Sequence, residues 1–197
     1  MKRFRIAFGL TLALLAAGCG GGAEQLAQHI AQGKALLAEG KYDAAAAELS
    51  QATALDQNSM EAWLQLGNAY AGQKKYDVAL SAYVAAKKID RHSIAPHVAH
   101  AKVQVELGRI EQATTELNFV VEMDPKNLEA LVLLGKVSQM ATKLPDGTTG
   151  VSQASLERAE LNLEAAATLA PQNAEVKSEL ARVRGELERR KNRGGVK

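Results

Sequence analysis

Small residues recur at a fixed interval along this chain, and that interval limits its fold more than any other feature. Gly33, Gly67, Ala101 and Gly135 follow one another at a spacing of 34 residues. Two short helices and their connecting turns use about that number of residues. One such unit cannot bury its apolar face alone, so it stacks against its neighbours. The sequence therefore predicts an all-α stack of repeats and not a single globular core.

The second unit, residues 60–93, carries the most complete pattern. Positions 4, 7, 8, 11, 20, 24 and 27 of this unit are Trp63, Leu66, Gly67, Tyr70, Ala79, Tyr83 and Ala86. The pattern resembles the tetratricopeptide repeat (TPR) family. This resemblance implies a right-handed superhelical solenoid of helix-turn-helix units.

Weaker versions of the pattern flank this unit on both sides. In register they give units 26–59, 94–127 and 128–173, and the last has Ala159 where strict spacing would place residue 147, an excess of 12 residues. The extra residues, about 142–152, contain Pro145, Gly147 and Gly150 and are expected to loop out. Two interpretations stay open, a neutral insertion or a loop that gates or extends a binding groove.

A final amphipathic helix is expected to cap the stack. Val176, Leu180, Val183 and Leu187 share one helical face over residues 174–191. From Lys177 onward the chain has eight Lys and Arg against three Glu, and residues 192–197 are expected to form a disordered basic tail. This charge fits either a solvated cap face or attraction to anionic lipid or an acidic partner.

The N-terminus has the pattern of an export signal. Lys2, Arg3 and Arg5 precede an apolar run that ends at Ala17, too short for a permanent membrane span. The following residues, up to the single cysteine at Cys19, resemble a bacterial lipobox, although Ala16 replaces the usual leucine. The resemblance implies a signal peptide over 1–18, a lipid on Cys19 and a flexible tether over 19–25. The alternative is an ordinary secretory signal followed by a stray cysteine.

The resemblance also implies a location. Gly20 stands where an inner-membrane retention signal would have Asp, which favours the periplasmic face of the outer membrane. More than one acyl chain gives durable membrane attachment. We therefore expect an exported, lipid-anchored protein, for which a nucleic-acid partner is not expected.

Positions 5 and 9 lie on the first helix of each unit, away from its packing face. The family resemblance assigns this side to a peptide-binding groove. The residues are Ile30, Leu64, Val98 and Val132 at position 5, and Lys34, Asn68, Lys102 and Lys136 at position 9. They predict a groove for a segment with apolar side chains and a carboxylate. Alternatively, Lys102 pairs with Glu106, and Glu61 and Glu129 neutralise the other lysines.

The sequence does not favour two narrower functions, chaperone-tail recognition and metal binding. The carboxylate clamp of chaperone-binding relatives is matched only by Asn68, so recognition of a chaperone tail is not implied. His92, His97 and His100 are close enough in sequence to share a metal, but positions 4 and 7 face the inside of the repeat, which favours a structural role. No catalytic motif is present, and neither catalytic residues, a metal nor a cofactor is expected.

These features predict a membrane-anchored scaffold that docks a peptide or domain of a cell-envelope machine. Small repeat lipoproteins that assist pilus or secretin assembly are the relatives it resembles, which implies an envelope protein as partner. One alternative is an adaptor for peptidoglycan-modifying enzymes. Another, of a different class, is a metal-binding or catalytic envelope protein that uses His92, His97 and His100. The oligomeric state stays open.

Overall fold

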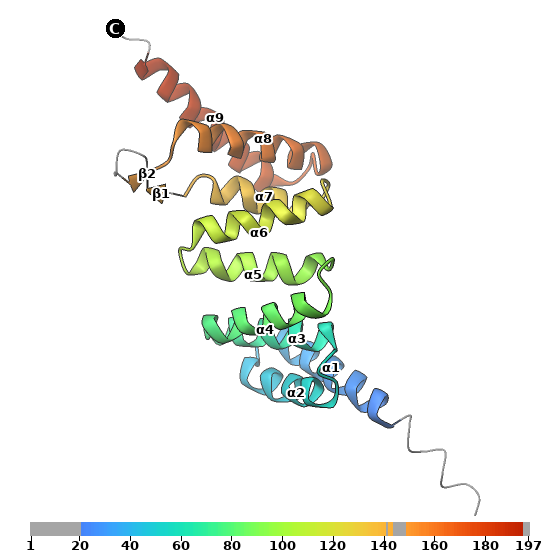
Figure 1. The fold of residues 1–197 in the computed structure, drawn as a ribbon. Coiled ribbons are helices and arrows are strands. Elements are labelled where there is room, and N and C mark those ends of the chain that lie inside the picture. Colours follow the sequence, from blue (N-terminus) through green and yellow to red (C-terminus); the bar gives the residue numbers. More distant parts are fainter. Residues whose placement is uncertain (1–20, 141, 144–148, 195–197) are drawn as a thin grey trace, which may run out of the picture.

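The computed structural model describes residues 21–140, 142–143 and 149–194, which form a stack of antiparallel helix pairs (Figure 1). The elements are α1 (Gly21–Ala38), α2 (Tyr42–Leu55), α3 (Met60–Gly72), α4 (Tyr76–Ile89), α5 (Ile94–Glu106), α6 (Ile110–Met123), α7 (Leu128–Val137), β1 (Thr142–Lys143), β2 (Thr149–Gly150), α8 (Gln153–Leu169) and α9 (Ala174–Gly194). The predicted all-α repeat fold is confirmed. Within the described ranges, no helix combines the length and hydrophobicity that crossing a membrane requires.

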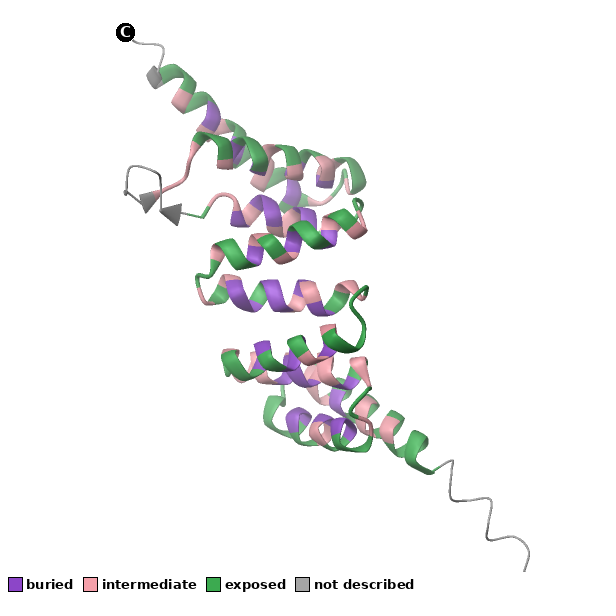
Figure 2. Ribbon diagram, in the orientation of Figure 1, coloured by how far each residue is buried: buried purple, intermediate pink, exposed green. Residues whose placement is uncertain are grey.

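The helices pair as α1 with α2, α3 with α4, α5 with α6 and α7 with α8, and α9 packs on the last pair. Each first helix also contacts the first helix of the next unit, from α1 through α3, α5 and α7 to α9. We call the side formed by α1, α3, α5 and α7 the inner face. Buried residues follow the contacts between neighbouring helices along the whole stack (Figure 2).

The recurring small residue allows the two helices of a unit to touch. A Cβ atom at Gly67 would lie 2.4 Å from Cε1 of Tyr83, and one at Gly135 would lie 2.5 Å from Cγ of Leu163. Tyr83 and Leu163 stand at the same position of their units, with 2 % and 0 % exposure. The large side chain of the second helix therefore occupies the space that glycine leaves open on the first.

Turn and cap residues set where the helices begin and end. Gly40, Lys74 and Gly108 occupy the same turn position, and each has a positive φ, of 72°, 60° and 68°. Ser59 and Asn127 accept hydrogen bonds from the backbone N–H groups of Ala62 and Ala130, which satisfies a donor that the start of a helix would otherwise leave free.

Two predicted boundaries differ from the structure. Helix α1 begins at Gly21, so residues 21–25 of the expected tether are helical; propagation costs only about 1 kcal/mol at each glycine, and no proline stops it. Helix α9 continues to Gly194, beyond the expected end at 191, and an ion pair of Glu186 with Arg190 supports its last turns. Cys19, residues 1–20 and residues 195–197 lie outside the described ranges.

The insertion of the fourth unit carries a short hairpin. Strands β1 and β2 pair antiparallel, with Thr142 opposite Gly150. Ser152 then caps α8 by accepting from the backbone N–H of Ser155. The excess residues thus lie between α7 and α8, as predicted.

Candidate functional site

Three ion pairs cross the inner face, each between the first helices of consecutive units or between α7 and the cap. They are Lys34 with Glu61 at 2.9 Å, Lys102 with Glu129, and Lys136 with Glu175. In each pair the lysine at position 9 meets a glutamate in the first turn of the next helix. We call these three pairs together the ladder, and each single pair a rung. Because each rung joins equivalent positions, the three lysines lie along one side of the stack.

The ladder changes the charge expected of the groove. Lys34 and Lys102 keep about half of their side chains exposed, 52 % and 51 %, yet each already has a carboxylate partner. Lys102 pairs with Glu129 of the next unit and not with Glu106 of its own helix. A ligand carboxylate would have to compete with these glutamates, so the surface presents neutralised pairs in place of free cations.

One rung is missing, between the second and third units. Asn68 and Ala95 occupy the two positions that carry lysine and glutamate elsewhere. The Asn68 amide donates to Oε1 of Gln65 at 3.0 Å and accepts from the hydroxyl of Tyr83 at 2.9 Å. Burial raises the pKa of Tyr83 above its ordinary value, so this hydroxyl stays protonated and donates. Both charges of the rung are replaced by uncharged groups.

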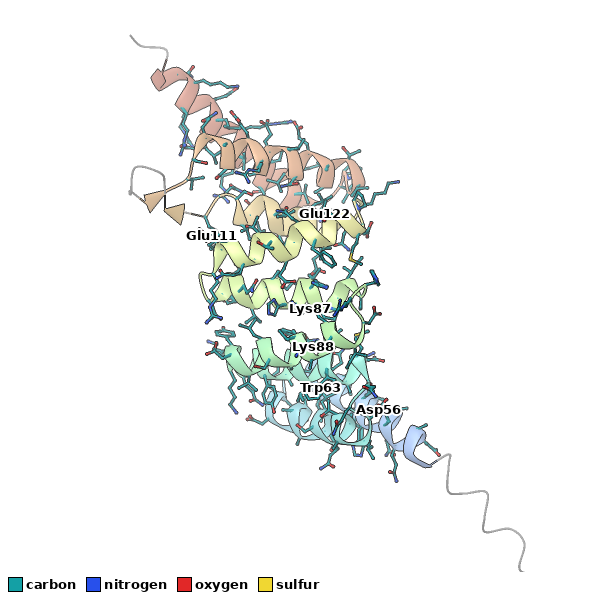
Figure 3. The ribbon with its side chains drawn as sticks, viewed as in Figure 1. Asp56, Trp63, Lys87, Lys88, Glu111 and Glu122 are labelled. Carbon is teal, nitrogen blue, oxygen red and sulfur yellow. The ribbon has the colours of Figure 1, made fainter. Side chains whose placement is uncertain are left out.

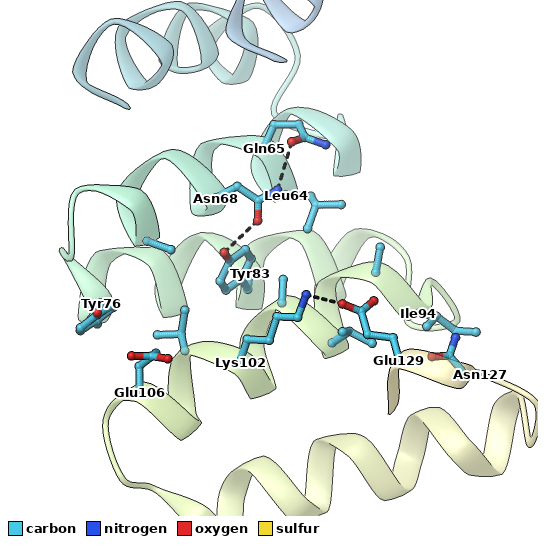
Figure 4. A pocket seen from close by; sticks show the side chains of 15 residues that line it. Leu64, Gln65, Asn68, Tyr76, Tyr83, Ile94, Lys102, Glu106, Asn127 and Glu129 are labelled. Carbon is cyan, nitrogen blue, oxygen red and sulfur yellow. Dashed lines mark hydrogen bonds and ion pairs between the residues drawn. The ribbon is translucent and has the colours of Figure 1, made fainter. Parts of the chain in front are cut away.

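A pocket of about 810 Å³ opens at this missing rung, shown in Figure 4. Its apolar lining comes from α3 and α5 and includes Leu64, Ala71, Ile94, Ala95, Val98 and Ala99. Asn68, Gln65 and Tyr83 provide the neutral polar groups, and the Lys102–Glu129 pair forms one rim. A concave, mostly apolar site with a few polar groups is typical of ligand pockets of this size.

The predicted groove residues lie at three different places along the stack. Leu64, Asn68, Val98 and Lys102 line this pocket, whereas Ile30 and Lys34 line a second pocket of about 630 Å³ beside α1. Val132 packs against the buried cluster that joins α7, α8 and α9, and Lys136 is paired with Glu175 of the cap. At the C-terminal end, α9 therefore occupies the position that a further unit would take.

A partly buried polar cluster lies behind the pocket, and sequence reasoning did not predict it. Lys87 extends from α4 toward α5 (Figure 3), and its Nζ lies 2.6 Å from Oε1 of Glu116. His97 and His100, on α5, place Nδ1 at 2.7 Å and 3.2 Å from the same carboxylate. We call these four residues the Glu116 cluster. It joins three consecutive helices, α4, α5 and α6.

The protonation of Glu116 follows from its surroundings. Burial alone would raise the pKa of this carboxyl group. Hydrogen bonds from His100, Lys87 and His97 outweigh that effect and hold its pKa well below the usual value. The carboxylate is therefore ionised and acts as an acceptor for three donors.

This geometry favours a structural role for the histidines. Nδ1 of His97 and of His100 is directed at Glu116, while His92 lies exposed on the turn before α5. No group of three or more His, Cys, Asp or Glu suited to a metal occurs in the described part of the chain. A sequence signal for the cluster did exist. His29 and Glu48 stand two periods before His97 and Glu116 and also form a pair, at 2.8 Å.

Two family models match the chain, one described as TPR repeat over residues 33–74 and one as tetratricopeptide repeat over residues 61–93. Solved TPR structures superpose on most of the stack. The chain is a TPR protein. PilF of Pseudomonas aeruginosa has a TM-score of 0.72 and 19 % identity, with 86 % of this chain and 72 % of that chain covered.

Other solved structures show the same fold at low identity, and one curated protein matches part of the sequence. MamA has a TM-score of 0.67 and 15 % identity, covering 85 % of this chain and 86 % of its own. YrrB, described as a TPR protein with an unusual peptide-binding site, has a TM-score of 0.61 and 19 % identity, covering 81 % and 76 %. Human Superkiller complex protein 3 is 27 % identical over 107 residues, which are 54 % of this chain and only 7 % of that protein.

Proposed function

We propose that this TPR protein is a membrane-anchored scaffold that docks a segment of a cell-envelope protein on its inner face. The observation that carries the proposal is the pocket at the missing rung, which is larger than the pocket beside α1 and lies midway along the stack. Protein scaffolding is the general role of TPR folds. The described residues supply apolar surface and neutral hydrogen-bonding groups, which suit a peptide segment.

Two comparisons support a segment of another protein as the ligand. YrrB carries a peptide-binding site, and a TPR of Spaghetti (RPAP3) with 21 % identity to this chain has been solved with a peptide bound. The chaperone-type carboxylate recognition is not proposed here, because the lysines of the inner face are already paired with glutamates.

The membrane part of the proposal rests on the sequence. The basic start, the apolar run and Cys19 at its end fit a lipoprotein signal. Cys19→Ser should abolish incorporation of a palmitate analogue and move the protein from the membrane fraction to the soluble fraction of cells. A Cys19→Ser protein that stays with the membrane would contradict lipid anchoring. The accompanying proposal of the outer membrane is checked by density separation of the two membranes.

Site-specific photo-crosslinking in the producing cells tests the docking itself. A photoreactive residue replaces Glu106, which is exposed at the pocket rim, or Ser81, which is exposed on α4 of the opposite side. One envelope protein should be captured from Glu106 and not from Ser81. Equal capture from both positions, or none from Glu106, would contradict the proposed groove.

The identity of the captured protein separates the remaining alternatives. A pilus, secretin or secretion component would support the assembly role, whereas a peptidoglycan hydrolase would support the adaptor role. The specific machine is thus decided by mass spectrometry of the crosslinked band.

A further inference from the structure

The missing rung has a consequence for what the inner face can accept. At the three complete rungs, a lysine and a glutamate lie close enough to fill the space between consecutive first helices with a charge pair. At the remaining junction, between α3 and α5, both members are replaced together, by Asn68 and Ala95. The rung position itself therefore carries no charge, while Glu106 and the Lys102–Glu129 pair stand at the rim of the pocket. The pocket is open and lined mainly by aliphatic side chains.

We infer that this gap takes an uncharged, apolar side chain of the docked segment, and that the flanking rungs disfavour charged side chains at that point. The inference rests on the proposed function and names the chemistry of its ligand. It differs from the sequence-based expectation, in which a carboxylate of the partner bound to the lysines.

Charge complementarity supports the apolar occupant. A carboxylate placed in the gap would lie in an apolar pocket whose nearest cation on the rim, Lys102, is already held by Glu129. An ammonium group would have to compete with Lys102 for Glu129, or stay at the rim beside Glu106, which is exposed to water. A charge buried among the apolar side chains of the gap would lose its hydration, which makes its burial unfavourable. An aliphatic or aromatic side chain has no charge to dehydrate and gains apolar contact with Leu64, Val98 and Ala99.

The neutral polar groups of the gap are compatible with this occupant. Asn68 is held between Gln65 and Tyr83, so its amide has a fixed orientation beside the apolar surface. The Tyr83 hydroxyl donates its hydrogen bond to Asn68 and supplies no negative charge. The polar groups of the gap are therefore already held in place by their own hydrogen bonds before a ligand binds.

Methyl NMR with blocked amino acids tests the inference directly. The probes are N-acetyl-leucine amide, N-acetyl-phenylalanine amide, N-acetyl-aspartate amide and N-acetyl-lysine amide, titrated into the folded protein. The apolar probes should shift the methyl signals of Leu64, Val98 and Ala99, with dissociation constants about tenfold lower than those of the charged probes. Equal or tighter binding of the aspartate probe, or no shift with any probe, would overturn the inference.

Three variants locate the effect at the rung. Ala95→Glu adds the missing carboxylate at an exposed site in the first turn of α5, where a negative charge suits the helix, and should weaken the apolar probes about tenfold. Ala95→Gln has the same size without the charge and should weaken them less. The double variant Lys34→Asn with Glu61→Ala opens a second gap beside Ile30 and should create a second set of shifted methyl signals there. Unchanged binding in Ala95→Glu would also overturn the inference.

The titration and the crosslinking can fail independently. Apolar probes that bind the gap while Glu106 captures no protein would leave the chemistry of the pocket intact and remove the proposed docking. Capture from Glu106 combined with a preference for the aspartate probe would keep the docking and reject the apolar occupant.

Discussion

Nδ1 of His97 lies 2.7 Å from Oε2 of Glu116, and the same pair recurs two units earlier between His29 and Glu48 at 2.8 Å. In the second unit these two positions hold Trp63 and Ala82, neither of which carries an ionisable group. The His–Glu pair is therefore present in the first and third units and absent from the second. In the third unit, His100 and also Lys87, from α4 of the second unit, contact Glu116, and there the pair becomes a cluster that joins three helices.

Removing the carboxylate of the Glu116 cluster should destabilise the protein strongly. Glu116→Gln leaves Lys87 with only 15 % of its side chain exposed and no anionic partner. We expect the free energy of unfolding to fall by about 2–4 kcal/mol, as for other partly buried charge networks that lose one member. Urea unfolding followed by circular dichroism measures it. Glu48→Gln is the matched control, and its loss should be about 1 kcal/mol or less, because that pair is about one third exposed.

The same cluster should make stability depend on pH in the acidic range. The pKa of Glu116 is lower in the folded protein than its ordinary value of 4.5, so its contribution is complete above about pH 5 and is lost as pH falls. The difference in unfolding free energy between wild type and Glu116→Gln should therefore shrink between pH 5 and pH 3. A difference that stays constant over this range would show that Glu116 is not held ionised by its neighbours.

Gly67 is expected to tolerate no side chain. Gly67→Ala places a methyl group 2.4 Å from the Tyr83 ring and should cost about 1–3 kcal/mol of stability. Gly185→Ala is the matched control, because a Cβ there meets nothing within 4 Å inside helix α9. It should raise stability by up to about 1 kcal/mol. Thermal unfolding of both variants makes the comparison, and equal effects would contradict the assigned packing.

Reversing the charge of the ladder lysines should weaken docking because the ion pairs are lost, and not because the partner needs a positive charge at one residue. Lys102→Glu with Lys136→Glu places like charges beside Glu129 and Glu175 and should weaken capture of the crosslinked partner while leaving helicity unchanged. Lys102→Glu with Glu129→Lys restores the pair in reverse and should recover capture. Failure of the swapped pair to recover capture would mean that Lys102 contacts the partner itself.

The regular part of this structure was predictable from sequence. The spacing of Gly67 and Gly135 gave the repeat register, and the register gave the side of each first helix that carries Leu64 and Lys102. Both predictions depend on a helical period that every unit shares. The excess residues of the fourth unit and the cap were predictable for the same reason, since each interrupts or ends that period.

Contacts between units were harder to predict. Lys102 has Glu106 one turn away and Glu129 on the next helix, and the choice between them depends on how far consecutive units rotate, which local spacing does not encode. The Glu116 cluster combines residues from three helices, so its parts lie too far apart for a motif. The correlation of histidine at position 4 with glutamate at position 23 was visible, in His29 with Glu48 and His97 with Glu116, and would have revealed the pairs.

In the proposed complex, a partner segment lies on the inner face with an apolar side chain in the gap beside Asn68. The decisive measurement is a structure of this protein bound to the segment captured from Glu106. We predict an uncharged apolar side chain of that segment in contact with Leu64 and Val98, with the Lys102–Glu129 pair intact. A segment bound across α2, α4 and α6, or a partner carboxylate bound to Lys102 in place of Glu129, would rule out this mode of docking.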